Sequence, residues 1–223
     1  MGFRRFVVSH IMKGVLNIIC KIDCVEFVQA LKNNKPLLVI FNHINFLEVP
    51  ILVTHSYPLN VSGLVKSETW DNPVFSFIFN TFKAVPIDRR GAFSESFKKV
   101  CEKIENGFYM CIAPEGTRSK DGVLGKGKPG IIQLALEANV PILPVAHHGG
   151  ENVWQNMKKL KRTPFFFKAG KPFRIKCDTM PGKEEREAIM TEVMTQIAKL
   201  LPEDMRGIYG EFALNETKYL EFI

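Results

Sequence analysis

The chain has 223 residues, of which 46% are hydrophobic and 24% are charged, and its formal net charge is +7. The length fits one sizeable domain, and the composition excludes collagen-like, disordered and disulfide-scaffold proteins. The positive charge indicates an anionic partner, such as a membrane surface or a nucleotide-like ligand. Eighteen phenylalanines against four tyrosines and two tryptophans favour apolar contact over base stacking, so we expect no nucleic-acid partner.

Cysteine usage and hydropathy indicate where the protein works. Five cysteines, an odd number, form no C-x-x-C pair, which predicts reduced, packed thiols in a cytosolic compartment. No apolar run reaches the ~18 residues that suggest a spanning helix. His10, Lys13 and Asn17 interrupt the first apolar segment, so we predict no secretory signal. We therefore expect any membrane contact to be peripheral or monotopic, on the cytoplasmic face.

An amphipathic helix is the first predicted element, over residues 3–20. The apolar residues that recur at helical spacing are Phe3, Phe6, Val7, Ile11, Val15 and Ile18. The polar residues of the opposite side are Arg5, Ser9, Lys13 and Asn17. Such a helix can lie in the lipid interface, or it can cover the protein's own core, and the segment alone fits both interpretations equally.

Strands and helices then alternate along the chain. Apolar runs bounded by turn residues predict strands at 37–41, 61–65, 85–87, 108–113, 140–145, 165–167 and 173–175. Helical spacing predicts helices at 73–82, 93–105, 129–137 and 184–201. This alternation is typical of the α/β class. We predict a single domain with a mixed, mainly parallel sheet flanked by helices, together with the N-terminal amphipathic helical extension.

A histidine and a glutamate follow the strand predicted at 37–41, in the segment N-H-I-N-F-L-E at residues 42–48. Such strand ends hold ligand chemistry in α/β proteins, and a histidine held by a carboxylate can act as a general base. In one helix, positions five apart point away from each other. His43 and Glu48 can therefore meet only if His43 stands in the loop and Glu48 in the first helical turn. Isolated pairs of this kind also arise by chance in many chains.

A second polar segment, P-E-G-T-R-S at residues 114–119, follows the strand predicted at 108–113. Gly116 allows close backbone approach, and Arg118 can hold a phosphate through two parallel hydrogen bonds. With Lys126 and Lys128 nearby, the segment predicts a phosphate cradle. The alternative is an ordinary turn in which Glu115 forms an ion pair with Arg118.

Two further basic segments carry less information. Arg89, in I-D-R-R-G at 87–91, is a possible additional phosphate ligand, but basic loop residues are usually just solvated. The stretch K-K-L-K-R at 158–162 can contact headgroups or a donor phosphate, or it can be a solvated loop. The five histidines lack metal-ligand spacing, although the adjacent His147 and His148 raise the question, and we predict no metal site.

Taken together, these segments resemble the motifs of the glycerolipid acyltransferase family, in particular of the 1-acyl-glycerol-3-phosphate acyltransferases. The matching blocks are N-H-x-x-x-x-E at 42–48, I-D-R at 87–89, P-E-G-T-R-S at 114–119, K-x-G at 128–130 and V-P-I-x-P-V at 140–145. Their order is that of the family. The departures are Glu48, where the family has aspartate, and Ala113, where it has an aromatic residue.

The resemblance implies direct acyl transfer with His43 as the catalytic base and Glu48 as the carboxylate that orients it. The substrate-binding residues that it implies are Arg89, Glu115, Gly116, Thr117, Arg118 and Lys128. The implied acceptor is lysophosphatidate, which becomes phosphatidate in phospholipid biosynthesis, and the implied donor is acyl-CoA or acyl-carrier protein, with no cofactor. Residues 33–223 would form the catalytic domain, and residues 1–32 an N-terminal amphipathic segment at the membrane surface.

Other functions stay open on the sequence. A related acyltransferase would use glycerol 3-phosphate, another lysophospholipid or an aminolipid as acceptor. A nonenzymatic anionic-lipid-binding protein would keep Arg118 and the N-terminal helix without needing His43. A nucleic-acid-binding module is less favoured, because the basic residues are dispersed and no stacking motif is present.

Overall fold

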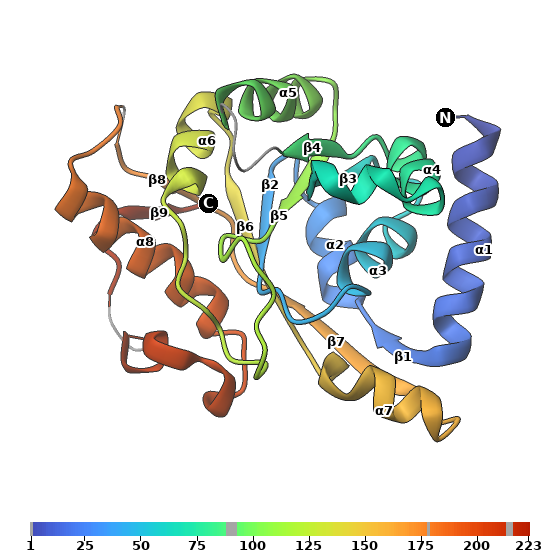
Figure 1. Ribbon diagram of the computed structural model, residues 1–223. Helices are drawn as coiled ribbons and strands as arrows, with labels where there is room; N and C mark the ends of the chain where they lie inside the picture. The colour runs from blue at the N-terminus through green and yellow to red at the C-terminus, as the bar shows by residue number, and fades with distance from the viewer. Residues whose placement is uncertain (1, 88–92, 178, 213–215) are drawn as a thin grey trace.

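The computed structural model describes residues 2–87, 93–177, 179–212 and 216–223 (Figure 1). The helices are α1 (Phe3–Ile19), α2 (Val25–Lys32), α3 (Glu48–His55), α4 (Pro73–Phe82), α5 (Phe93–Glu105), α6 (Gly130–Ala138), α7 (Val153–Lys158) and α8 (Lys183–Ala198). The strands are β1 (Cys20–Asp23), β2 (Leu38–Phe41), β3 (Val61–Lys66), β4 (Val85–Ile87), β5 (Tyr109–Ile112), β6 (Ile142–His148), β7 (Thr163–Ala169), β8 (Phe173–Ile175) and β9 (Leu220–Phe222). The 3₁₀ helices are η1 (Ser67–Asp71), η2 (Gly150–Asn152), η3 (Glu203–Met205) and η4 (Gly207–Phe212).

The strands of the described residues form one nine-stranded sheet. Its main path runs β1-β7-β6-β2-β5-β3-β4, and β8 and β9 continue from β6. β2 is parallel to β5 and β6, and β3 is parallel to β5 and β4. β7 and β8 run antiparallel to β6. The carboxyl ends of β2 to β6 therefore share one edge, which is where parallel sheets place ligand chemistry.

Helices cover both faces of this sheet, and β2 shows why. Its side chains alternate between the two faces, and all four residues of the strand are buried. Leu38 and Ile40 pack in the core with α5, α6 and α8, whereas Val39 and Phe41 pack in the core with α2 and α3. Figure 1 shows these two helical layers on either side of the strands. A strand buried on both faces has no polar side, so its sequence is a continuous apolar run.

The predicted fold class is confirmed, with its mixed, mainly parallel sheet and its N-terminal helix. The bounds predicted for α4, β4 and α5 are those of the structure. Residues 20–32, which we assigned to the N-terminal segment, contribute β1 to the sheet and two core side chains, Phe27 and Leu31 of α2.

Helix α1 turns Arg5 and Ser9 of its predicted polar side toward the protein, together with the apolar Leu16, and turns its predicted apolar side outward. Arg5 and Ser9 are buried, and the guanidinium of Arg5 donates a hydrogen bond to the carbonyl of Leu59 at 2.9 Å. All six residues of the predicted apolar side are exposed or half-buried, and Phe3, Ile11 and Ile18 are 82%, 61% and 72% exposed. These side chains therefore do not cover the protein's own core. No helix in the described part of the chain has both the length and the apolar character needed to cross a membrane.

Candidate active site

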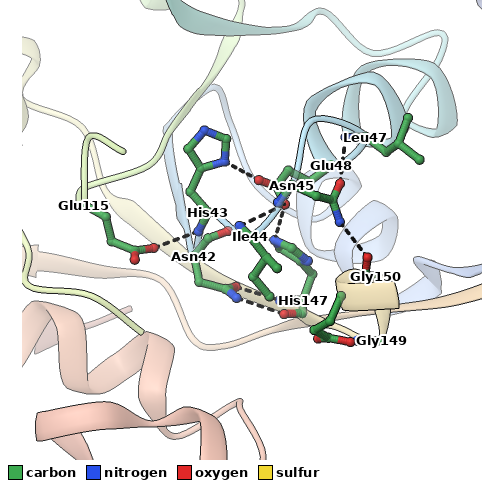
Figure 2. Close-up of polar contacts among 11 residues, drawn as sticks. Asn42, His43, Ile44, Asn45, Leu47, Glu48, Glu115, His147, Gly149 and Gly150 are labelled. Carbon is green, nitrogen blue, oxygen red and sulfur yellow. Dashed lines mark hydrogen bonds and ion pairs between the residues drawn. The ribbon is translucent and has the colours of Figure 1, made fainter. Parts of the chain in front are cut away.

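His43 and Glu48 meet across the loop that joins β2 to α3. His43 stands in this loop and Glu48 is the first residue of α3, the arrangement that the spacing requires. The Nδ1 atom of His43 is hydrogen-bonded to Oε1 of Glu48, and the other ring nitrogen, Nε2, points away from the carboxylate (Figure 2). The side chain of His43 is 25% exposed and that of Glu48 is 0% exposed. A buried carboxylate thus holds a histidine that a substrate can reach.

The loop before Glu48 is fixed by its own polar groups. The backbone N–H groups of Ile44 and Asn45 donate to Oε2 of Glu48 at 3.3 and 3.2 Å. The side chain of Asn45 accepts a hydrogen bond from the backbone N–H of Leu47 at 2.7 Å and donates one to the carbonyl of Gly150 at 3.1 Å. The Glu48 carboxylate therefore folds back on the loop, and the loop is tied to the segment after β6.

Glu48 has a second histidine partner, His147, which the sequence did not assign to the site. The Nε2 atom of His147 lies 2.6 Å from Oε2 of Glu48, and its side chain is completely buried. β6 continues past the predicted strand, so His147 shares the sheet face of Leu143 and Val145. Side chains alternate between the two faces of a strand, so extending the predicted strand to residue 147 would have placed His147 on that face. The pattern would not have placed it against Glu48.

The environment keeps the Glu48 carboxyl ionised. Burial alone raises its pKa, but the charge and hydrogen bond of His147, together with those of His43, outweigh burial and lower this pKa to about 2. For His147 burial acts in the opposite direction and lowers the pKa, but the neighbouring Glu48 more than reverses that effect, so the pKa is raised. An ionised Glu48 fixes the proton of His43 on Nδ1 and leaves the lone pair on Nε2, which is the tautomer that a general base needs.

The P-E-G-T-R-S segment holds the backbone of His43 in place. The buried carboxylate of Glu115 accepts hydrogen bonds from the backbone N–H groups of His43, at 2.7 Å, and of Gly125, at 2.8 Å. The backbone N–H of Ser119 donates to the carbonyl of His43 at 2.7 Å. The hydrogen bonds of Glu115 thus run to backbone groups rather than to Arg118, and the segment positions the His43 loop as well as forming a turn.

A cavity of about 320 Å³ opens beside this segment. The predicted residues Thr117, Arg118 and Lys126 line it, and so does Lys120, which the sequence did not assign to the site. Gly116 has φ +67°, and a Cβ atom there would lie 3.0 Å from the Nζ of Lys128, so the lysine crosses over the glycine. The cavity therefore presents three cations, Arg118, Lys120 and Lys126, against the carboxyl groups of Glu115 and Asp121, and these cations can neutralise a phosphate.

The described residues that line this cavity include neither of the two further basic segments. Arg89 lies outside the described residues. Arg162, in the basic stretch at 158–162, donates two hydrogen bonds to the carbonyl of Cys20 and so binds β1.

Within the described ranges, no group of three or more His, Cys, Asp and Glu side chains is arranged to hold a metal ion. Cys111 is a free thiol, and burial raises its pKa to about 12, so it is not an activated nucleophile.

The fold and the site define an α/β protein with a histidine–carboxylate pair at the carboxyl edge of its sheet, beside a cationic cavity. Such a site is suited to deprotonating a group on an anionic substrate. Residues 24–148 match the sequence model of a family described as Acyltransferase, and the chain belongs to this family.

Proteins of similar sequence are known from bacteria and plants. The chain is 30% identical over 153 residues to a 1-acyl-sn-glycerol-3-phosphate acyltransferase of Pseudomonas aeruginosa, covering 66% of the chain and 59% of that protein. It is 27% identical over 164 residues to an N-acylphosphatidylethanolamine synthase of Arabidopsis thaliana, covering 66% and 58%. The chain thus spans less than two thirds of the length of these relatives.

A solved structure has the same fold. The crystal structure of the 1-acyl-sn-glycerophosphate (LPA) acyltransferase from Thermotoga maritima superposes with a TM-score of 0.62, covering 96% of this chain and 81% of that one. The sequence identity is 19%, so this likeness concerns the fold alone.

Proposed function

We propose that the chain transfers a fatty acyl group from an acyl thioester to the free hydroxyl of lysophosphatidate, giving phosphatidate. The observation that carries the proposal is the pairing of His43 Nδ1 with the buried, ionised Glu48, which leaves Nε2 as a base on the accessible side. The name of the Pseudomonas aeruginosa relative supports this acceptor. The donor is acyl-CoA or acyl-carrier protein, and no further cofactor takes part.

The proposed reaction is direct. Nε2 of His43 takes the proton of the acceptor hydroxyl while the hydroxyl oxygen attacks the carbonyl carbon of the thioester. The new C–O bond forms, the C–S bond breaks, and the proton passes from His43 to the leaving sulfur, so the products are an ester and a free thiol. Glu48 stabilises the imidazolium between these steps. The substrate supplies the nucleophile, so the mechanism needs no acyl-enzyme.

The cationic cavity supports a phosphate-bearing acceptor. Arg118 offers a planar pair of donors to a phosphate, and Lys126 adds a positive charge from the same wall. Gly116 and Lys128 shape the adjoining backbone, and Thr117 adds a hydroxyl. In this proposal Glu115 acts on the His43 loop, and Arg89 stays a predicted phosphate ligand.

The outer surface of α1 and α4 supports docking on a membrane, with the chain peripheral or monotopic on the cytoplasmic face. The exposed apolar side chains of α4 are Val74, Phe75 and Phe77. α4 contacts α1, whose Arg4 donates to the carbonyl of Asn80 at 3.3 Å. A cavity of about 590 Å³ beside the start of α1 is lined by Arg4, Lys83 and Lys103. An exposed apolar face next to positive charge suits an anionic lipid surface.

Transfer to the amine of an aminolipid is the second candidate, because the chain resembles an N-acylphosphatidylethanolamine synthase at a similar level of identity. Such a substrate carries a phosphodiester, which the same cations can hold. The two candidates therefore differ in the attacking atom and in the charge of the headgroup, and the choice of acceptor separates them.

The test is thiol release from an acyl-CoA on detergent micelles, with lysophosphatidate, phosphatidylethanolamine or glycerol 3-phosphate as acceptor. We expect release that depends on lysophosphatidate and falls by orders of magnitude in His43→Ala, since this substitution removes the base. His148→Ala is the matched control, because His148 stacks on Phe166 instead of contacting Glu48.

Equal rates in native protein and His43→Ala would show that His43 is not the base. If phosphatidylethanolamine is the only acceptor that supports release, the acceptor is an aminolipid and not lysophosphatidate. Failure of every acceptor with both acyl-CoA and acyl-carrier protein, with liposome binding intact, would favour a lipid-binding protein.

A further inference from the structure

A second histidine shares the catalytic carboxylate. Glu48 lies between two imidazole rings: Oε1 faces Nδ1 of His43 and Oε2 faces Nε2 of His147 (Figure 2). We propose that His147 is a positioning residue, which donates a hydrogen bond from Nε2 to Oε2 of Glu48 and so keeps Oε1 directed at His43. The catalytic part of this inference rests on the proposed acyl transfer.

The surroundings of His147 decide where its proton lies. Its Nε2 atom is 2.6 Å from Oε2 of Glu48 and 2.7 Å from the backbone carbonyl oxygen of Asn42. Both neighbours are acceptors, so Nε2 carries a hydrogen in either charge state of the ring. The other nitrogen, Nδ1, is buried with no hydrogen-bond partner. The hydrogen-bonding capacity of this side chain is therefore used on one side, where Glu48 and Asn42 lie.

The main chain of His147 is held as firmly as its ring. The side-chain amide of Asn42 donates to the backbone carbonyl of His147 at 2.9 Å, and the backbone N–H of His147 donates to Oδ1 of Asn42 at 2.8 Å. The ring stacks on Phe167 of β7, with centroids 5.4 Å apart. The end of β6 is thus locked to the residue next to His43, and the ring has little freedom to leave Glu48.

A completely buried carboxylate has a large desolvation cost unless hydrogen bonds offset it. His147 offsets this cost from the side opposite His43, and it does so inside the protein, where solvent does not screen the interaction. The ionisable groups around the pair are His43, Glu115 after β5, and Glu151 of η2. Both glutamates favour proton uptake nearby. His147 is the side chain that opposes protonation of the Glu48 carboxylate at Oε2, where the backbone N–H groups of Ile44 and Asn45 also donate.

Removing the donor therefore has a defined consequence. Without His147, the carboxylate has one side-chain partner left, and the His43–Glu48 pair takes up its proton at higher pH. The base form of His43 then exists over a narrower pH range, and the ring is held less firmly. A misplacement of about 1 Å in a catalytic group can lower a rate about 100-fold. The acceptor's phosphate lies on other residues, so its binding is unaffected.

Three substitutions separate this role from a purely structural one. His147→Leu keeps the approximate volume and removes the donor. His147→Gln places an amide nitrogen at the same number of bonds from Cα as Nε2, and so retains the donor. His147→Asn is one bond shorter and cannot reach Glu48. If His147→Leu does not fold, the comparison of His147→Gln with His147→Asn gives the same test, because both are polar and they differ by one methylene.

The first measurement needs no substrate. The ring resonances of His43 in the full chain are followed by NMR as pH is varied. We expect the midpoint in His147→Leu to move to higher pH by about one unit, which is about tenfold in proton affinity, and the midpoint in His147→Gln to move less. An unchanged midpoint in His147→Leu would overturn the inference, and this holds for any acyl acceptor. If His147→Leu does not fold, an unchanged midpoint in His147→Asn has the same meaning.

The second measurement is the rate of thiol release with lysophosphatidate, against pH. We expect kcat to fall about 10- to 100-fold in His147→Leu, with KM unchanged, the acid limb moved to higher pH, and His147→Gln largely rescued. In a Glu48→Gln background His147→Leu should add no further loss, because His147 acts through the carboxylate. Full additivity in that cycle would overturn the inference. If no acceptor is used but the NMR midpoint shifts, the proposed function fails and the positioning role stands.

Discussion

Glu115 and His43 follow neighbouring strands, and the carboxylate of Glu115 accepts a 2.7 Å hydrogen bond from the backbone N–H of His43. The second oxygen of Glu115 accepts from the backbone N–H of Gly125 at 2.8 Å. One buried side chain therefore fixes both the loop that carries His43 and the loop that lines the cationic cavity. Two motifs that are far apart in the chain form a single structure through this contact.

Replacing Glu115 by Gln tests this arrangement. Glutamine keeps one acceptor oxygen and turns a donor toward the other backbone N–H, which leaves a buried donor unpaired. We expect the free energy of unfolding to fall by about 1–3 kcal/mol, and kcat to fall while the KM for lysophosphatidate stays close to native. Glu185→Gln, an exposed residue of α8, is the matched control. Denaturant unfolding and steady-state kinetics measure the two effects. A rise in KM with stability and kcat unchanged would mean that Glu115 contacts the substrate instead.

The cations of the cavity give a second prediction, about Arg118. Arg118→Ala should raise the KM for lysophosphatidate about tenfold or more, since a hydrogen bond to a charged group contributes about 1.5–3 kcal/mol. Arg118→Lys should recover only part of the loss, because lysine lacks the planar pair of donors. Lys171→Ala, an exposed cation between β7 and β8, controls for the change in net charge. Equal KM values in native protein and Arg118→Ala would place the acceptor's phosphate elsewhere.

The third prediction concerns stability against pH. The pKa of Glu48 in the folded protein is about 2, below its ordinary value of 4.5, so ionised Glu48 stabilises the fold. This contribution is fully present above about pH 4.5 and is lost as pH falls toward 2; by linkage it amounts to ~3 kcal/mol. Urea unfolding of native protein and Glu48→Gln at pH 7, 5, 4 and 3 measures it. We expect the native protein to lose stability more steeply than the variant below pH 5, and parallel curves would contradict this.

How far the sequence determines such a site can be seen from Glu48. Its pairing with His43 follows from spacing, because only a loop histidine and a glutamate in the first helical turn can meet, and α3 begins at Glu48. Its pairing with His147 depends on the register of β2 against β6, which places Phe41 opposite Val145. Register across distant strands is set by tertiary packing, and no local pattern in either segment encodes it.

The elements show the same division. The long periodic segments that became α1, α4, α5 and α8 were predictable because their apolar spacing extends over several turns. The sequence did not predict β1, whose residues C-K-I-D form no apolar run, nor α2 and α3, whose eight residues each are too few for a helical period to be recognised. The sequence also could not predict the orientation of α1, since an amphipathic pattern does not say which side meets the protein. Here the polar Arg5 is buried against the loop at Leu59.

That orientation gives the last prediction, which concerns membrane docking. Ile11 is 61% exposed on the apolar side of α1, so Ile11→Asp removes apolar contact with lipid without opening a cavity in the protein. We expect weaker cosedimentation with liposomes that contain anionic lipid, and a free energy of unfolding within about 0.5 kcal/mol of native, as for most surface substitutions. The control is Ser94→Asp, which adds the same charge at an exposed position of α5, in the opposite helical layer. If both variants weaken binding equally, charge alone governs docking. If Ile11→Asp binds like native protein while its fold is intact, the apolar side of α1 does not meet the membrane and another surface of the chain must do so.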